Sequence, residues 1–161
     1  MRILGIDPGL ANTGFGIIDY KAGKFCLAGY GVIETDSSQS HELRLLYLYN
    51  RLSAVIEEFK PDAAEMETLY FSRNTSSAMA VAEAKGVITL CLAQSAVPLY
   101  FYTPNQIKYA VTGTKTADKE TVQNCVKMLL RLKEKPSPDH AADALAGAIT
   151  CINSGDLTLT F

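Results

Sequence analysis

The sequence has few of the patterns that hold structural metals or disulfides. Its cysteines, Cys26, Cys91, Cys125 and Cys151, are widely separated and form no CxxC pair. Its two histidines have no zinc-ligand spacing either. We therefore expect reduced, buried thiols rather than a disulfide framework or a zinc cluster.

No uninterrupted apolar run is long enough to span a membrane. The most apolar internal stretch, residues 78–96, is interrupted by Glu83, Lys85 and Gly86, whereas a spanning helix needs roughly 20 apolar residues. The opening apolar run does not resemble a secretion signal, because Asp7 interrupts it. These features predict a cytoplasmic protein without a membrane partner.

A strong net charge is also lacking, since the formal charge is −2 at pH 7. The charges are nevertheless unevenly distributed. Residues 108–135 are mainly basic, whereas residues 57–67 are mainly acidic. An acidic centre beside a basic flank suits a metal-dependent enzyme with a polyanionic substrate, although ordinary solvated helix faces would give the same pattern.

The composition, 48% hydrophobic and 20% charged, is that of a globular protein. We expect one domain over residues 1–153 and a disordered tail over 154–161. Period-two and helical patterns predict strands at 2–7, 13–19, 24–34, 63–68 and 98–103, and helices at 40–60, 75–95, 106–111, 119–132 and 139–153. This order predicts an α/β fold with a mixed five-stranded sheet, three strands antiparallel and two parallel, flanked by helices.

The predicted topology gathers acidic residues at the ends of these elements. Asp7 ends the first strand, Glu67 ends the fourth, and Asp143 lies on the last helix one turn after His140. Three carboxylates and an imidazole that converge would bind Mg²⁺ or Mn²⁺. One or two such ions could activate water for phosphodiester hydrolysis.

Each of these residues also has a purely structural interpretation. Asp7 could begin a turn with Pro8 and Gly9, and Asp143 could hydrogen-bond a neighbouring loop. Glu65 competes with Glu67, because both lie on the same face of the predicted strand. His140 and Asp139 could simply begin a helix.

Several motifs resemble those of the RuvC-type Holliday-junction resolvases. They are ILGIDPG at 3–9 with TGFG at 13–16, ETLYFSRN at 67–74, AKG at 84–86 and HAADALA at 140–146. They occur in the family's order and span residues 2–152. The resemblance implies a ribonuclease-H-like fold, a homodimer, and paired, symmetric, metal-dependent cutting of four-way DNA junctions in recombination and repair.

The resemblance also implies roles for individual residues. Asp7, Glu67, His140 and Asp143 carry over as catalytic metal ligands for Mg²⁺, with Mn²⁺ able to substitute. The family often has aspartate at the position of His140, which leaves Asp139 as an alternative fourth ligand. DNA contacts carry over to Tyr70 as a base-stacking aromatic and to other residues as weaker candidates: Phe71, Arg73, Lys108, Lys115 and Lys119. A branch-migration helicase complex of the RuvA/RuvB type is the partner implied by the family alone.

Two other functions remain open from the sequence. The GIDPG segment also resembles the phosphate loop of actin-like ATPases and sugar kinases, but those enzymes use two such domains and this chain has room for one. A junction-binding module without catalysis is the third hypothesis, favoured by the histidine at position 140 and opposed by the three acids. Nicking of a synthetic junction would separate these possibilities.

Overall fold

The computed structural model describes residues 1–68, 75–155 and 157. Its strands are β1 (Arg2–Asp7), β2 (Asn12–Lys21), β3 (Lys24–Glu34), β4 (Ala63–Glu67) and β5 (Leu99–Tyr102). They form one sheet in the order β3-β2-β1-β4-β5. Strands β1, β2 and β3 are antiparallel neighbours, whereas β4 lies parallel to β1 and to β5. The mixed five-stranded sheet predicted from the sequence is confirmed.

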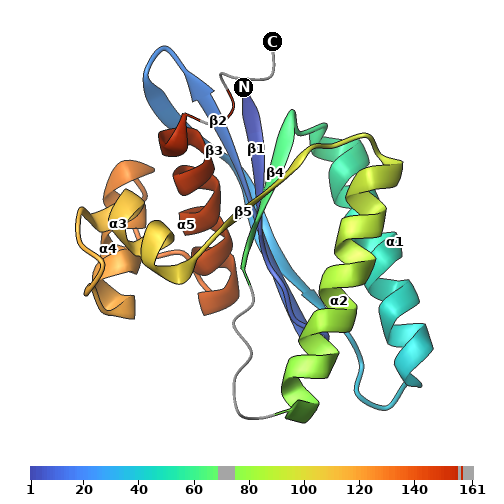
Figure 1. Cartoon of the computed structure of the whole chain (residues 1–161). Helices are drawn as coiled ribbons and strands as arrows, with labels where there is room; N and C mark the ends of the chain where they lie inside the picture. The colour runs from blue at the N-terminus through green and yellow to red at the C-terminus, as the bar shows by residue number, and fades with distance from the viewer. Residues whose placement is uncertain (69–74, 156, 158–161) are drawn as a thin grey trace.

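Helices cover both faces of this sheet (Figure 1). One layer contains α1 (His41–Phe59) and α2 (Thr75–Gln94), and the other contains α3 (Pro104–Thr112), α4 (Lys119–Leu129) and α5 (Asp139–Ser154). Strand side chains alternate between the two layers. Ile3 therefore packs into the core beside α5, whereas Leu4 and Ile6 pack into the core beside α1 and α2.

The first hairpin forms where the sequence places its Pro-Gly turn. The hydroxyl of Thr13, which is fully buried, donates a 2.6 Å hydrogen bond to the carbonyl of Gly9. This bond fixes the turn because it satisfies a buried polar group locally. Asp7 pairs with Gly14 across the hairpin, so its carboxylate stands at the end of β1, immediately before the turn.

The two short helices differ from the sequence prediction at their ends. Helix α3 begins at Pro104, earlier than expected, because Thr103 and Gln106 form a capping box. Helix α4 ends at Leu129 rather than near residue 132, since the chain turns at Arg131, which has a φ of 53°. Ser40 precedes α1 but makes no side-chain capping bond.

Most of the predicted tail 154–161 lies outside the described residues. Leu157, which is described, is buried in the core beside α5, so that residue belongs to the packed domain. None of the helices in the described part of the chain is long and apolar enough to cross a membrane.

Candidate active site

Two acidic residues meet at one end of the sheet because of strand register. Strand β1 pairs in parallel with β4, with Ile3 opposite Ala63 and Ile6 opposite Met66. One step further along, Asp7 and Glu67 end the two strands side by side. The carboxyl ends of parallel strands are where α/β sheets place ligands.

Helix α5 brings the next two residues to the same place. The His140 Nδ1 atom lies 2.7 Å from Oδ2 of Asp7, a hydrogen bond between the first turn of α5 and the end of β1. Asp143 lies one turn further along α5 and is close enough to raise the pKa of Asp7 by repulsion. The four residues predicted from the sequence are thus brought together from β1, β4 and α5.

Lys119, at the start of α4, forms ion pairs with two acids of α5. Its Nζ lies 3.1 Å from Oδ2 of Asp143 and 3.2 Å from Oδ2 of Asp139. The amide of Gln123 donates a second hydrogen bond, of 3.0 Å, to Asp139. Asp139 is therefore engaged with α4, whereas His140 is engaged with Asp7.

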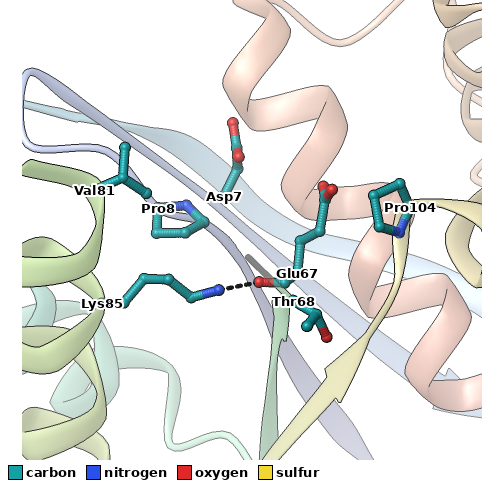
Figure 2. Close-up of a pocket in the computed structure, with 7 residues that line it drawn as sticks. All are labelled: Asp7, Pro8, Glu67, Thr68, Val81, Lys85 and Pro104. Carbon is teal, nitrogen blue, oxygen red and sulfur yellow. Dashed lines mark hydrogen bonds between the residues drawn. The ribbon is translucent and has the colours of Figure 1, made fainter. Parts of the chain in front are cut away.

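Two adjoining hollows flank Glu67. The first, here called the Asp7 hollow, is about 260 Å³ and is drawn in Figure 2; the residues that line it are Asp7, Pro8, Glu67, Thr68, Val81, Lys85 and Pro104. The second, the Lys119 hollow, is about 250 Å³ and is lined by Glu67, Pro104, Ile107, Lys108, Lys119, Val122, Asp143 and Ala146. Because Glu67 and Pro104 line both hollows, the two form one depression across the end of the sheet.

The acidic side chains of this depression disfavour one another's ionisation. Burial raises the pKa of Asp7, and the charge of Asp143 adds to it, while the hydrogen bond from His140 opposes it. Burial likewise raises the pKa of Glu67, with further contributions from Asp7 and Asp143. A cation placed among the three carboxylates would relieve both burial and repulsion.

The donor chemistry fits a hard divalent ion. Carboxylate oxygens are the preferred ligands of Mg²⁺, and an imidazole is accepted by Mn²⁺. Among residues 1–68, 75–155 and 157, however, no three such side chains form a ready metal-binding group. In this structure Lys119 pairs with Asp143, and His140 pairs with Asp7. Those pairs would have to open for the residues to share an ion.

Glu65 lies beneath the site with its side chain fully buried. It shares the α5 face of β4 with Glu67, and its carboxylate occupies the space that a Cβ on Gly147 would fill, with Oε2 1.8 Å from that position. Its Oε1 atom has no hydrogen-bond partner among the described residues. Burial raises the pKa of Glu65 well above 4.5, helped by the charges of Glu67 and Asp7 and opposed by Lys85.

Glu65→Gln is expected to stabilise the metal-free protein at pH 8 and to leave it unchanged at pH 4. A carboxyl group whose pKa is raised on folding destabilises the protein as the pH rises above the pKa of that group in the unfolded chain, 4.5. The uncharged amide does not suffer this loss, so the unfolding free energy should rise by about 1–3 kcal/mol at pH 8. Urea unfolding in EDTA at both pH values measures it, with the exposed Glu58→Gln as control. If Glu65→Gln and wild type differed in unfolding free energy by the same amount at both pH values, the raised pKa of Glu65 would be contradicted.

The basic residues predicted to contact DNA divide into three groups. Lys108 and Lys119 line the hollow that contains Glu67 and Asp143. Lys115 is exposed in the loop between α3 and α4 and is not among the described residues that line either hollow. The predictions for Tyr70, Phe71 and Arg73 fall outside the described residues.

Lys85 was not assigned a role from the sequence, yet its ammonium group points into the Asp7 hollow (Figure 2). It donates a hydrogen bond to the backbone carbonyl of Glu67. The available signal was a lysine in the middle of the most apolar stretch of the chain. A basic residue there either reaches the edge of the helix layer or has a polar partner.

Comparison with known proteins agrees with this geometry. The family model described as crossover junction endodeoxyribonuclease RuvC matches residues 3–151. A crossover junction endodeoxyribonuclease RuvC from Treponema denticola is 52% identical over 155 residues, covering 96% of this chain and 87% of the relative. The solved Thermus thermophilus RuvC structure aligns with a TM-score of 0.89 at 34% identity, covering 98% of this chain and 97% of that one. The same protein in complex with a Holliday junction substrate aligns with a TM-score of 0.89 at 32% identity, covering 98% of this chain and 96% of that one.

Proposed function

This chain belongs to the RuvC family of crossover junction endodeoxyribonucleases, and we propose that it resolves four-way DNA junctions by paired, symmetric hydrolysis of two strands. The observation that carries the proposal is the convergence of Asp7, Glu67 and Asp143 in one depression beside Lys108 and Lys119. The ribonuclease-H-like fold, shared with the Thermus thermophilus structure, presents these acids at the sheet end. We assign the nuclease domain to residues 1–153.

The residues of the site divide the work of hydrolysis. Asp7, Glu67, His140 and Asp143 would hold one or two metal ions, and the family is one of metal-dependent nucleases. We propose Mg²⁺, with Mn²⁺ able to substitute because of the imidazole. When bound, the metal supplies an activated water and charge stabilisation at the phosphate. Lys119 and Lys108 add fixed positive charge on the side of the Lys119 hollow, where charge develops on the phosphate oxygens.

Lys119 has two acidic partners, and only one of them is a proposed metal ligand. If Asp143 bound a metal, the ion pair with Asp139, held in turn by Gln123, would keep the ammonium group at the site. Neighbouring acids also raise the pKa of Lys119, although burial by itself would lower it. Lys119 therefore stays charged while phosphate binds.

Substitution of His140 and substitution of Asp139 should affect the cleavage rate and its Mg²⁺ dependence differently. His140→Ala removes a proposed ligand that contacts Asp7, so the cleavage rate should fall by about 100-fold and more Mg²⁺ should be needed for half the maximal rate. Asp139→Ala only loosens Lys119 and should lower the rate by less than about 10-fold at unchanged Mg²⁺ dependence. Single-turnover cleavage measured across a Mg²⁺ series distinguishes them. If Asp139→Ala shifts the Mg²⁺ dependence and His140→Ala does not, Asp139 is the fourth ligand.

We propose a DNA substrate and contacts to it from the remaining candidate residues. A Holliday junction is the substrate of the Thermus thermophilus protein in its complex, and we propose the same substrate here. Neutralisation of phosphates by lysines should make binding fall steeply with salt. We also propose base stacking by Tyr70 with Phe71, and phosphate contacts by Arg73 and Lys115.

A homodimer is proposed because symmetric cutting needs two sites. The exposed face of α2 supplies an apolar contact surface: Met79 is 65% exposed and Leu90 is 55% exposed, and helical spacing puts both on one side with Gly86 between them. Light scattering should give twice the 17.5 kDa chain mass. A RuvA/RuvB-type complex is the further partner we propose, to be tested by co-sedimentation on junction DNA.

Cleavage of a labelled mobile four-way junction in Mg²⁺ tests the function directly. Paired nicks at symmetric positions, absent in EDTA, are the expected result. Binding without nicks in Mg²⁺ or Mn²⁺ would make the chain a junction-binding protein instead. The match to the RuvC family model over residues 3–151 supports the nuclease rather than an actin-like ATPase.

A further inference from the structure

Lys85 reaches the site from the opposite side to the other two lysines. Lys108 lies on α3 and Lys119 on α4, both in the layer that contains α5, whereas Lys85 lies on α2 in the other layer (Figure 1). The carboxylates of Asp7 and Glu67 stand at the sheet end between these layers. Basic side chains therefore flank the acids on both sides.

The ammonium group of Lys85 contacts a backbone carbonyl and an aromatic ring. It donates to the Glu67 carbonyl and lies 5.7 Å from the centroid of the Phe101 ring. Among the described residues, no carboxylate forms an ion pair with it. An ammonium has three N–H donors, and the backbone carbonyl uses one of them. The remaining donors are available to the Asp7 hollow, into which the group points (Figure 2).

The Asp7 hollow combines groups that suit a phosphodiester. Its walls carry acids that favour a metal on one side and a fixed cation on the other, with Pro8 and Val81 as apolar spacers. A phosphate oxygen forms a strong, charge-assisted hydrogen bond with an ammonium group. Because this hollow joins the Lys119 hollow at Glu67 and Pro104, an extended strand can cross from one to the other.

We propose, on the basis of the function assigned above, that Lys85 is a third phosphate-binding lysine of the cleavage site. The strand to be cut crosses the end of the sheet between the two helix layers, with one phosphate against Lys85 and another against Lys108 and Lys119. Lys85 binds a phosphate near the scissile one and, through the Glu67 carbonyl, fixes the end of β4. It thereby connects DNA binding to the position of the Glu67 carboxylate.

Neutral phosphate analogues test this contact. A set of junctions carries a single methylphosphonate at each phosphate near the cut, the scissile one excepted, and each is assayed with wild type and with Lys85→Gln. Lys85→Gln should slow cleavage and weaken binding by about 10-fold each on the normal junction. At one position, the methylphosphonate should slow wild type by a similar factor and leave Lys85→Gln unaffected.

Three further measurements make the result decisive. Lys85→Arg keeps the charge and should recover most of the rate and the sensitivity to that same phosphate. Lys24→Gln removes a lysine at the β2–β3 turn, at the other end of the sheet, and should behave as wild type. Thermal unfolding shows whether each variant folds; if Lys85→Gln does not, the phosphate sensitivity of Lys85→Arg decides the question.

Binding in EDTA is measured on the same junctions, so that the two proposals fail separately. Wild type that binds but never cuts would overturn the nuclease function, while the coupling between Lys85 and one phosphate would still appear in the dissociation constants. The role of Lys85 would be overturned if Lys85→Gln and the methylphosphonate acted independently at every phosphate. Their separate effects would then multiply in both binding and cleavage.

Discussion

Asp7→Asn is expected to lower the rate of junction cleavage by a factor on the order of 10³ or more while junction binding survives. The substitution keeps the shape of the side chain and replaces a charged oxygen with an amide. Asp7 stands at the end of β1 between Glu67 and α5, where it can share a metal with both. An amide lacks the negative charge that a divalent ion requires in this position.

The fold should tolerate this substitution. Burial raises the pKa of Asp7, so the ionised carboxylate is unfavourable in the metal-free protein above its unfolded pKa. Removing that charge therefore leaves the unfolding free energy at pH 7 equal to or above the wild-type value. Single-turnover cleavage, a binding assay and urea unfolding are run on the same preparation. Glu58→Gln, an equal change at the exposed end of α1, should leave all three unchanged.

Two outcomes would contradict the role of Asp7. Cleavage within about 10-fold of wild type would show that the carboxylate is not a ligand, since removing a charged group that acts directly has a larger effect. Loss of binding together with cleavage would show that Asp7 acts through the shape of the hairpin turn. In that case, its pairing with His140 would be structural only.

Gly5→Ala is expected to be the most destabilising single-methyl change in β1, by about 3 kcal/mol or more. A Cβ at position 5 would lie 1.8 Å from the carbonyl oxygen of Ala144 and 2.9 Å from the nitrogen of Ala148. Both atoms belong to the backbone of α5, which cannot move locally without losing its helical hydrogen bonds. The helix as a whole must therefore move away from the sheet.

That displacement should also reduce catalysis. His140 and Asp143 lie on α5, so moving this helix away from β1 also moves both residues away from Asp7. Gly29→Ala is the matched control, because the three atoms nearest to its Cβ all belong to the ring of Phe59, the closest at 2.8 Å. This contact is with the far end of a side chain, which can shift by a few tenths of an ångström, so the expected loss is below about 1 kcal/mol. Urea unfolding and cleavage rates measure both variants; equal stability of the two would refute the close contact between β1 and α5.

The sequence predicted the elements well because their signals are local. Short apolar runs marked β1, β4 and β5, and helical spacing marked α1 and α5. The end of α4 was misplaced, since a left-handed residue such as Arg131 carries no composition signal. Strand order followed from a rule about crossovers, which the parallel pairing of β1 with β4 confirms.

The sequence by itself determined which residues stand at the ends of elements: Asp7 on β1, Glu67 on β4, and His140 with Asp143 on α5. Tertiary structure decided which of them touch. The contact between Asp7 and His140 joins residues 133 positions apart, and the one between Lys85 and Glu67 comes from a different helix layer. Local patterns fix the direction of a side chain along its own element, whereas the distance between elements depends on how closely they pack. Here that distance is set by contacts such as the one between Gly5 and α5.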